Sequence, residues 1–497
     1  MKRKNKNKRA ELSPTETLQA SLQFFQPLLS AEEFALLVAE VQRPLLPAIR
    51  YNPLKAKAAA IEELGLRYGW QLYPIPFCDQ GFRVDDSQGT PVSQTAEHHL
   101  GQYYIQEAAS MLPAELFSVD PVNPGLTLDL AASPGGKTTH LVSRTLDEGF
   151  ILANDSSQGR IPALRIVLQK WGAVNTAISQ FPGEKLGAWF PEVFDRALID
   201  APCSMQGLRT AESHSSRPVT EKESASLSRR QGSLLISALQ AVKVGGQVVY
   251  STCTLLPDED EGVVDAVLRR LGSSVRLVDV QPSLPQPAPG LTRNGDREYT
   301  AELSRSLRLW PHRLGTAGFF ACLLEKTSSI DLPTQTPPSR PLDRTGFLVC
   351  MRAEERDILA SFIADFGFDL EAILQKYHLR LVKRFEKLFV FPAAVLEQFA
   401  TLPLESAGMT LAESSPEGWI PSHEWVSRFG DAFTQKKLAL DDARSQSWLR
   451  GEDLLDFPVT DFPKGSVLVL TNPRGLVIGR ARVSQDRLKN LLPRRLI

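Results

Sequence analysis

Two cysteines stand in settings that favour nucleophilic chemistry. Cys203 lies in the run Asp200-Ala201-Pro202-Cys203-Ser204, and Cys253 lies in the run Tyr250-Ser251-Thr252-Cys253-Thr254. A thiolate is a strong nucleophile, and a nearby cation or helix N-terminus activates it. A buried cysteine is more commonly a small apolar residue, and either one alone would be interpreted that way. Because both follow predicted strands, and one of them follows a carboxylate, the pair indicates a covalent catalytic site.

A glycine-rich turn stands earlier in the chain, at Ala131-Ala132-Ser133-Pro134-Gly135-Gly136-Lys137. It follows the buried-strand pattern of residues 126–130 and precedes helical apolar spacing through Leu141 and Val142. A strand, a glycine turn and a helix N-terminus form the mouth of nucleotide-type cofactor sites. An ordinary strand-to-helix turn is the alternative interpretation.

The same turn partly matches the phosphate-binding pattern G-x-x-x-x-G-K-[ST], with Gly136, Lys137 and Thr138 in its last positions. Ala131 stands where the first glycine belongs, and Pro134 has no amide hydrogen to donate to a phosphate. The sequence therefore favours a cofactor with an adenosine but no phosphate, such as S-adenosylmethionine, over a nucleoside triphosphate.

Asp155 directly follows the next predicted strand, residues 150–154. It stands about twenty residues beyond the glycine turn, where a carboxylate binds ribose hydroxyls in such sites. Asp155 can also cap the helix predicted over 158–171, and the two roles are compatible.

The elements that must position these residues alternate between strand and helix. Strands are predicted at 126–130, 150–154, 194–200, 246–251, 275–280 and 319–325, and helices at 158–171, 223–242 and 259–271. This alternation predicts an α/β fold of the Rossmann-like kind, a mostly parallel sheet with helices on both faces. All the polar motifs follow strand ends, so they should meet at the carboxyl edge of one sheet, where such folds bind ligands.

Composition limits the remaining possibilities. A chain of 497 residues with 42% hydrophobic residues predicts three or four ordinary domains, at about 100–200 residues each. A net charge of −1 excludes a uniformly basic protein, so any nucleic-acid surface must be local. The five cysteines form no C-x-x-C pair, which argues against zinc and disulfides and favours reduced thiols in the cytoplasm. We also expect no membrane segment, no metal and a monomer.

The flanking regions predict further modules. Residues 1–115 are predicted to form a small α+β RNA-binding module with a basic tail (1–9) and helices at 15–28, 31–41 and 56–68. Residues 116–327 are predicted to form the catalytic domain. The Ser-, Thr- and Pro-rich stretch 328–344 is predicted to be a linker. Residues 345–430 form a mixed module, and residues 431–497 form a β module with a helix at 438–449 and a basic end suited to nucleic-acid phosphates. The basic, aromatic stretch 379–392 favours a strand pair with a solvated face over RNA contact.

A thiolate and a methyl-donor cofactor suit one acceptor in particular, carbon 5 of a pyrimidine. Addition of a thiolate at carbon 6 makes carbon 5 nucleophilic enough to accept a methyl group, and loss of the carbon 5 proton then expels the thiolate. Asp200 can hydrogen-bond the base edge while charge develops, and Lys137 can reach the same rim. The base must be unpaired or flipped, and the second cysteine can assist release.

These motifs resemble the RNA cytosine-5 methyltransferases of the NOL/NOP/Sun superfamily, most closely the bacterial RsmF-type 16S ribosomal RNA enzymes. The resemblance also rests on Tyr103 to Glu107, Arg308 to His312, Pro421 to His423 and Leu449 to Glu452. It implies a class I S-adenosylmethionine-dependent methyltransferase core with a C-terminal PUA-like RNA-binding module. It further implies that Cys253 is the nucleophile and Cys203 the release helper. The residues that would line the cofactor site are Ala131, Ala132, Ser133, Pro134, Gly135, Gly136, Lys137, Asp155 and Asp200.

The chain departs from that family in two loops. Pro182 stands where the family usually carries an aspartate near the adenine, and Met205-Gln206 stands where Gly-Glu is common. We expect 16S ribosomal RNA, alone or in the small ribosomal subunit, as the partner. The alternatives are transfer RNA or another ribosomal RNA position, and a catalytically silent RNA-binding assembly factor.

Overall fold

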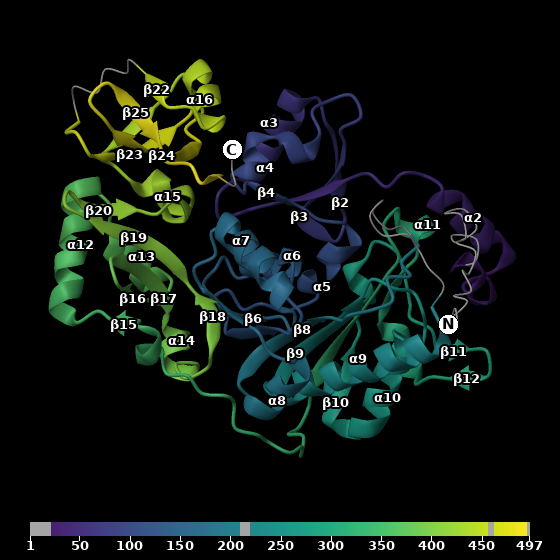
Figure 1. Cartoon of the computed structure of the whole chain (residues 1–497). Coiled ribbons are helices and arrows are strands. Elements are labelled where there is room, and N and C mark those ends of the chain that lie inside the picture. Colours follow the sequence, from purple (N-terminus) through teal and green to yellow (C-terminus); the bar gives the residue numbers. More distant parts are fainter. Residues whose placement is uncertain (1–20, 209–218, 456–461, 495–497) are drawn as a thin grey trace, which may run out of the picture.

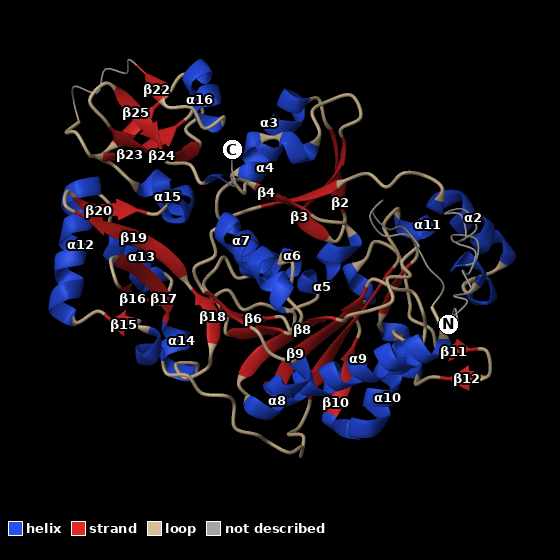
Figure 2. Cartoon of the chain, in the orientation of Figure 1, coloured by secondary structure: helices blue, strands red, loops and turns tan. Residues whose placement is uncertain are grey.

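The computed structural model describes residues 21–208, 219–455 and 462–494 of the chain. A nine-stranded sheet lies at the centre, with an N-terminal module on one side and two C-terminal modules on another (Figures 1 and 2). The basic tail and the first part of the helix predicted at 15–28 lie outside the described residues.

The central sheet has the strand order β10-β14-β9-β8-β5-β6-β7-β18, and β13 pairs with β14. Five neighbouring strands run parallel: β5 (Leu126–Asp129), β6 (Phe150–Asn154), β7 (Thr176–Ser179), β8 (Phe194–Asp200) and β9 (Val242–Thr252). The others are antiparallel: β10 (Val275–Val278), β13 (Leu307–Leu309), β14 (Phe319–Lys326) and β18 (Leu404–Ala407). The predicted α/β fold with a mostly parallel sheet is thus confirmed.

Side chains of the buried strands alternate between two hydrophobic layers, as the pleat of a strand requires. Leu152 of β6 packs into the layer that contains helix α9, whereas its neighbours Ile151 and Ala153 pack into the layer that contains α6 and α7. In Figure 1, α6 and α7 lie above the sheet, and α8, α9 and α10 lie below it. The helix bounds are α6 Gly136–Arg144, α7 Ile161–Trp171, α8 Leu186–Trp189, α9 Glu221–Ala241 and α10 Glu261–Leu271.

The N-terminal module is a four-stranded sheet of order β2-β3-β1-β4 packed with short helices. Its elements are β1 (Ala48–Tyr51), α3 (Ala58–Tyr68), β2 (Gln71–Ile75), β3 (Cys78–Asp85) and β4 (Tyr103–Ile105). Helix α2 (Ala31–Val41) precedes this sheet in the chain and packs with Leu255 and Trp310 of the central domain. Ser30 caps α2 by accepting a hydrogen bond from the amide of Glu33 at 3.2 Å. The helix predicted at 31–41 is therefore confirmed.

Three polar side chains of the segment 50–55 attach this module to the rest of the molecule. Arg50 is fully buried and donates to Gln106, Ser143, Thr139 and the carbonyl of Gly136. Asn52 donates to the carbonyls of Gly101 and Trp171 at 2.9 and 2.8 Å. Lys55 donates to the carbonyls of Leu100 and Lys170 and to the hydroxyl of Ser427. Hydrogen bonds therefore fix the docking of this module.

Residues 345–430 form a second sheet, of order β15-β16-β17-β19-β20. Its strands are β15 (Leu348–Val349), β16 (Leu379–Arg384), β17 (Lys387–Pro392), β19 (Met409–Ser415) and β20 (Gly418–Pro421); its helices are α12 (Arg352–Phe366), α13 (Leu370–Lys376), α14 (Ala393–Gln398) and α15 (His423–Phe429). The predicted strand pair at 379–392 is confirmed as the hairpin β16–β17. This segment also supplies β18, which pairs with β7 and extends the central sheet.

The last module is a five-stranded sheet of order β21-β23-β24-β25-β22. Its elements are β21 (Lys437–Ala439), α16 (Asp442–Leu449), β22 (Leu454–Leu455), β23 (Val467–Thr471), β24 (Val477–Val483) and β25 (Arg487–Asn490). The helix predicted from residue 438 is wrong at its start, because Leu438 and Ala439 belong to a strand parallel to β23. Asp441 then caps α16 by accepting from the amide of Arg444 at 2.7 Å.

No helix within the described parts of the chain is both long enough and apolar enough to cross a bilayer.

Candidate active site

The glycine turn connects β5 to α6 at the carboxyl edge of the sheet. Gly135 has a φ of 114°, and a Cβ there would lie 2.9 Å from Val167 Cγ1, so only glycine suits this position. Asp155, just beyond β6, accepts hydrogen bonds from the amides of Ser133 at 3.2 Å and Ser157 at 2.9 Å. The structure therefore brings the turn and the predicted ribose-binding carboxylate together.

Asp129, at the end of β5, has one oxygen with a partner and one without. Oδ2 accepts from the hydroxyl of Thr138 at 2.7 Å, whereas Oδ1 is buried with no hydrogen-bond partner. Burial raises the pKa of Asp129 to about 7, against the opposing effect of the Thr138 hydrogen bond. A buried, unpaired carboxyl oxygen beside the glycine turn suits a cofactor that carries an ammonium group, as S-adenosylmethionine does.

The two predicted cysteines meet at the ends of β8 and β9. The Sγ atoms of Cys203 and Cys253 lie 2.9 Å apart, both residues are partly exposed, and both are free thiols. The hydrogen bond to Cys253, together with burial, raises the pKa of Cys203 well above its ordinary value. The two sulfur atoms thus share one hydrogen bond, and the raised pKa keeps Cys203 in its thiol form near neutral pH.

Lys137 and Asp200 form an ion pair next to the cysteines. Lys137 Nζ lies 2.8 Å from Asp200 Oδ2 and 3.1 Å from the hydroxyl of Ser110. Burial disfavours the charge on Lys137, but the negative charges of Asp200 and Cys253 outweigh burial and raise its pKa. A permanently charged ammonium thus lies within electrostatic range of both the carboxylate and the cysteine.

Hydrogen bonds to the buried Glu259 side chain fix the loop that carries Cys203. Glu259 Oε2 accepts from the amide of Ser204 at 2.9 Å and from Gln231 Nε2 at 2.9 Å, and its side chain is fully buried. Burial raises the pKa of Glu259. Gly207 closes the same loop against Cys253, because a Cβ at Gly207 would lie 2.7 Å from the Cys253 carbonyl oxygen.

The loop that carries Cys253 is held by the next two acids of the chain. Asp260 accepts from the hydroxyl of Thr252 at 2.6 Å, one residue before the cysteine. Glu261 pairs with the fully buried Arg308, which donates to the carbonyl of Leu255 at 2.7 Å, two residues after the cysteine. Three consecutive buried acids therefore fix both cysteine loops.

These supporting residues could not be recognised from the sequence. The acids at 258–261 indicated only a helix start, although helix α10 begins at Glu261 and the preceding acids lie in a turn. Arg308 was identified only as part of a motif that resembles the family. Arg160 Nη1 lies 3.7 Å from Asp155 Oδ2. Nothing in the sequence marks Arg160 as a site residue except its position near a helix start.

Met205, one of the two departures from the family pattern, lies in an unusual backbone conformation. Its φ is 59°, in the left-handed region that favours the glycine common at this position in the family. The other departure, Pro182, is exposed just after the end of β7. Both lie in loops at the carboxyl edge of the sheet, so neither disrupts the strands that position the site.

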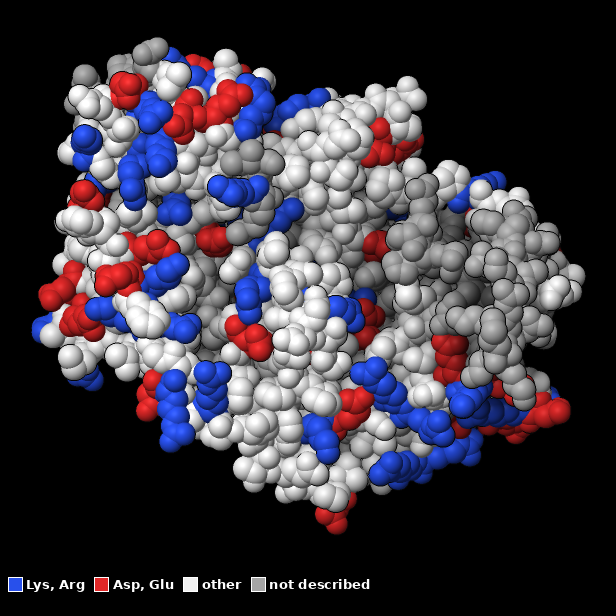
Figure 3. Space-filling model, viewed as in Figure 1, with Lys and Arg blue, Asp and Glu red and all other residues white. Residues whose placement is uncertain are grey.

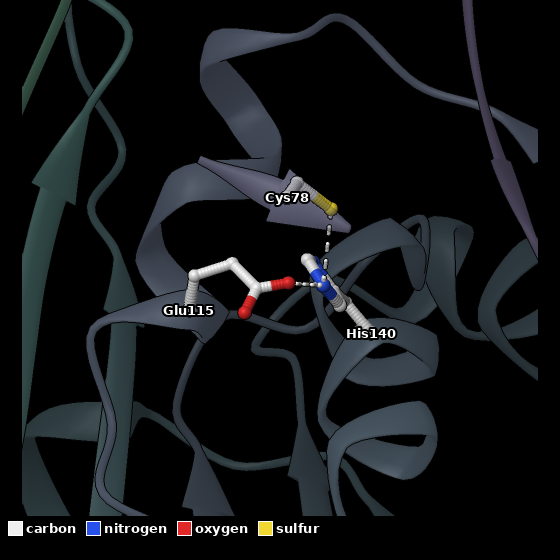
Figure 4. Close-up of side chains that lie close together, drawn as sticks. All are labelled: Cys78, Glu115 and His140. Atoms are coloured by element: carbon white, nitrogen blue, oxygen red, sulfur yellow. Dashed lines mark hydrogen bonds and ion pairs between the residues drawn. The ribbon is translucent and has the colours of Figure 1, made fainter. Parts of the chain in front are cut away.

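Another close group of polar side chains lies where the N-terminal module meets the central domain (Figure 4). His140 Nε2 lies 2.9 Å from Glu115 Oε1 and 3.8 Å from Cys78 Sγ, and within the described residues these three donor atoms are close enough for one metal ion. Arg144 already pairs with Glu115 at 2.9 Å, which balances its charge. The geometry thus suits a hydrogen-bonded link between modules, and the expected lack of a metal stays a prediction.

Three family models match separate parts of the chain. They are described as 16S rRNA methyltransferase RsmB/F (residues 116–325), the N-terminal domain of 16S rRNA methyltransferase RsmF (residues 20–108) and the methyltransferase RsmF PUA domain (residues 435–497). Together they match a methyltransferase domain over the segment that contains both cysteines, an RsmF N-terminal domain before it and an RsmF PUA domain after it.

Full-length relatives agree with these models. The chain is 32% identical to ribosomal RNA small subunit methyltransferase F of Erwinia tasmaniensis, over 96% of this chain and 95% of that one. It is 34% identical to the protein of the same name from Klebsiella pneumoniae, over 94% and 93% of the two chains. A crystal structure of a methyltransferase homologue from Pyrococcus horikoshii has a TM-score of 0.53 and 29% identity, covering 63% of this chain and all (100%) of that one.

Proposed function

Because the chain belongs to the ribosomal RNA small subunit methyltransferase F family, we propose that it methylates carbon 5 of a cytosine in 16S ribosomal RNA. The methyl donor is S-adenosylmethionine, and the reaction passes through a covalent bond between Cys253 and carbon 6 of the base. The observation that carries this proposal is the 2.9 Å contact between the sulfur atoms of Cys203 and Cys253 beside the Lys137–Asp200 ion pair. An rRNA methyltransferase that modified a nucleophilic nitrogen or a ribose hydroxyl would need no thiolate.

The cofactor is bound by the turn from Ala131 to Lys137, with Asp155 available to the ribose. The buried, unpaired Oδ1 of Asp129 suits its ammonium group. When bound, the cofactor supplies an electrophilic methyl group. Pro134 removes a backbone donor that a phosphate would use, which supports a cofactor without phosphates.

The residues of this chain act on the cytosine. Cys253 Sγ bonds to carbon 6, and the electron pair of the 5,6 double bond becomes available at carbon 5. Asp200 hydrogen-bonds the N3/N4 edge of the base while charge develops there. After methyl transfer, the carbon 5 proton is lost to a solvent water molecule, and the electron pair of that C–H bond expels the Cys253 thiolate from carbon 6. Cys203, whose sulfur lies 2.9 Å from that of Cys253, protonates the departing thiolate.

The reaction is tested by bisulfite sequencing of ribosomal and transfer RNA from cells with and without the gene. We expect one or a few protected cytosines in 16S ribosomal RNA to lose protection. Loss confined to transfer RNA would keep the chemistry and reject the substrate. No change in either RNA would reject cytosine-5 methylation.

The covalent step has its own test in the release helper. Cys203→Ala removes the proton donor for the departing thiolate, so this variant should accumulate a protein–RNA adduct that survives denaturing electrophoresis. Cys253→Ala should form no adduct and should still bind RNA. Free turnover by Cys203→Ala without any adduct would show that Cys203 does not assist release.

A further inference from the structure

A groove with a cavity volume of about 360 Å³ lies between helix α7, strand β18 and the hairpin β16–β17. Three arginines from separate segments line it: Arg165 of α7, Arg340 of the stretch before β15, and Arg384 at the end of β16. Phe347 and Phe389 also line it. No residue proposed for methyl transfer lies in this groove.

The charges in the groove are unbalanced. Glu405 is the one carboxylate among the lining residues, and it lies 3.5 Å from Arg165. Among the described residues, Arg340 and Arg384 have no carboxylate within ion-pair distance, and both are exposed. Arg165 Nε is buried without a hydrogen-bond partner. The groove therefore carries a surplus of two positive charges and an unused guanidinium donor.

The aromatic residues give the groove a second property. The Arg384 guanidinium lies 4.9 Å from the ring centroid of Phe347, and the Phe347 and Phe389 ring centroids are 5.3 Å apart. Unpaired RNA bases stack on aromatic rings and on guanidinium planes, while arginines bind the adjoining phosphates. The groove thus combines the two contacts that an unpaired nucleotide needs.

The position of the groove separates it from the methyl-transfer site. Strands β9, which leads to Cys253, and β18 are five intervals apart in the sheet, or about 24 Å at ~4.8 Å per interval. A nucleotide bound here would therefore be several residues away from the modified cytosine. Figure 3 shows Lys and Arg side chains on this side of the molecule, at the lower left, around the positions of β18 and α14 in Figure 1.

We propose that this groove binds an unpaired nucleotide of the substrate RNA that flanks the target site, through Arg340 and Arg384 on its phosphates and the Arg384–Phe347 stack on its base. The proposal rests on the proposed function only in taking RNA as the partner. It assigns RNA contact to the basic, aromatic segment 379–392, in addition to its confirmed role as a strand pair.

The test is RNA binding by the full chain carrying Arg340→Gln and Arg384→Gln together. We measure the Kd for 16S ribosomal RNA by filter binding over a range of salt concentrations. The double variant should bind the RNA at least tenfold more weakly. The magnitude of the slope of log K against log salt concentration should fall by about 1.4, because each of the two lost phosphate contacts on single-stranded RNA contributes about 0.7 to that slope. A matched control, Arg352→Gln with Arg356→Gln on exposed positions of α12, removes the same charge outside the groove.

The outcomes separate this proposal from the proposed function. Equal Kd values and salt slopes for the groove variant and the unaltered protein would overturn the proposed RNA contact in the groove. Equal losses of affinity in the two double variants would show a general effect of charge and would also overturn it. The Kd is measured without methyl transfer, so it tests the groove independently of the reaction. If the groove variant binds RNA more weakly and the unaltered protein methylates no cytosine, the proposed methylation is rejected and the groove is not. In steady-state methylation, the groove variant should raise KM and leave kcat within about twofold.

Discussion

Cys203 and Cys253 should differ in reactivity although their sulfur atoms are 2.9 Å apart. The pKa of Cys203 is raised well above its ordinary value by the hydrogen bond to Cys253 and by burial. Because only a thiolate reacts with iodoacetamide, Cys203 should stay unmodified from pH 7 to pH 9 while Cys253 is labelled first. Peptide mass spectrometry after brief labelling checks this order.

The other three cysteines and one variant provide the controls. Cys78, Cys322 and Cys350 are buried, and burial raises the pKa of each, to about 12 for Cys78 and about 11 for Cys350. They should remain unlabelled under the same conditions. In Cys253→Ala the hydrogen bond is lost, so the pKa of Cys203 falls and its labelling should increase. Faster labelling of Cys203 than Cys253 in the unaltered protein would contradict the assignment of Cys253 as nucleophile.

The turn of consecutive acids before α10 is the element that holds the site together. Glu259→Ala leaves the Ser204 amide and the Gln231 side chain without their buried acceptor, at a cost of about 1–3 kcal/mol. The loop of Cys203 should then deviate from its position, and turnover should fall about ten- to hundredfold. Glu259→Gln keeps one acceptor oxygen and should retain more activity than Glu259→Ala.

The neighbouring exposed acid is the matched control for this turn. Within the described residues the side chain of Asp258 makes a surface ion pair with Arg297, at 3.1 Å, and no other polar contact, so Asp258→Ala should leave turnover almost unchanged. Affinity for S-adenosylmethionine, measured by calorimetry, should be the same in both alanine variants, because Glu259 contacts the cysteine loop. Equal turnover in the two alanine variants would show that Glu259 does not position Cys203.

At the scale of elements, a strand could be predicted from the sequence where its hydrophobic pattern and the motif that follows it agree. A strand could not be predicted where its pairing partner lies in a distant segment of the chain. The strands ending at Asp129, Asn154, Asp200 and Thr252 could be predicted, because each is a short apolar run followed by a polar motif. The pairing of β18 with β7 could not, because these strands lie more than 220 residues apart and β18 contains Glu405 and Ser406 rather than a continuous apolar run. The helix predicted from residue 438 starts too early for a related reason, because Leu438 and Ala439 pair with β23.

At the scale of the whole molecule, the parts of the chain are joined more closely than their separate sequences indicate. Val469 and Val477 of the last module pack in one core with Phe429 and other residues of the preceding module. The central sheet takes its edge strand β18 from beyond residues 328–344. An RNA bound to several modules at once would therefore meet a surface of fixed geometry, which suits recognition of a folded ribosomal RNA segment by shape.

Lys55 joins three of these parts, and its pKa gives the junction a pH dependence. Its ammonium donates to the Leu100 and Lys170 carbonyls and to Ser427, and burial lowers its pKa from 10.5 to about 7. The unfolded chain therefore binds more protons than the folded protein between pH 7 and about 10.5, so this group makes stability rise with pH in that window, by at most about 1.4 kcal/mol per pH unit.

Lys55→Met removes this contribution and supplies the measurement. Calorimetric melting temperatures at pH 7, 8 and 9 should show the unaltered protein gaining on Lys55→Met as pH rises, because all other titrating groups are common to both. Lys57→Met, two residues away and exposed, should instead run parallel to the unaltered protein. A constant difference between the unaltered protein and Lys55→Met across this range would mean that Lys55 titrates near its ordinary pKa. The junction would then be accessible to water even though three carbonyl and hydroxyl oxygens surround the ammonium.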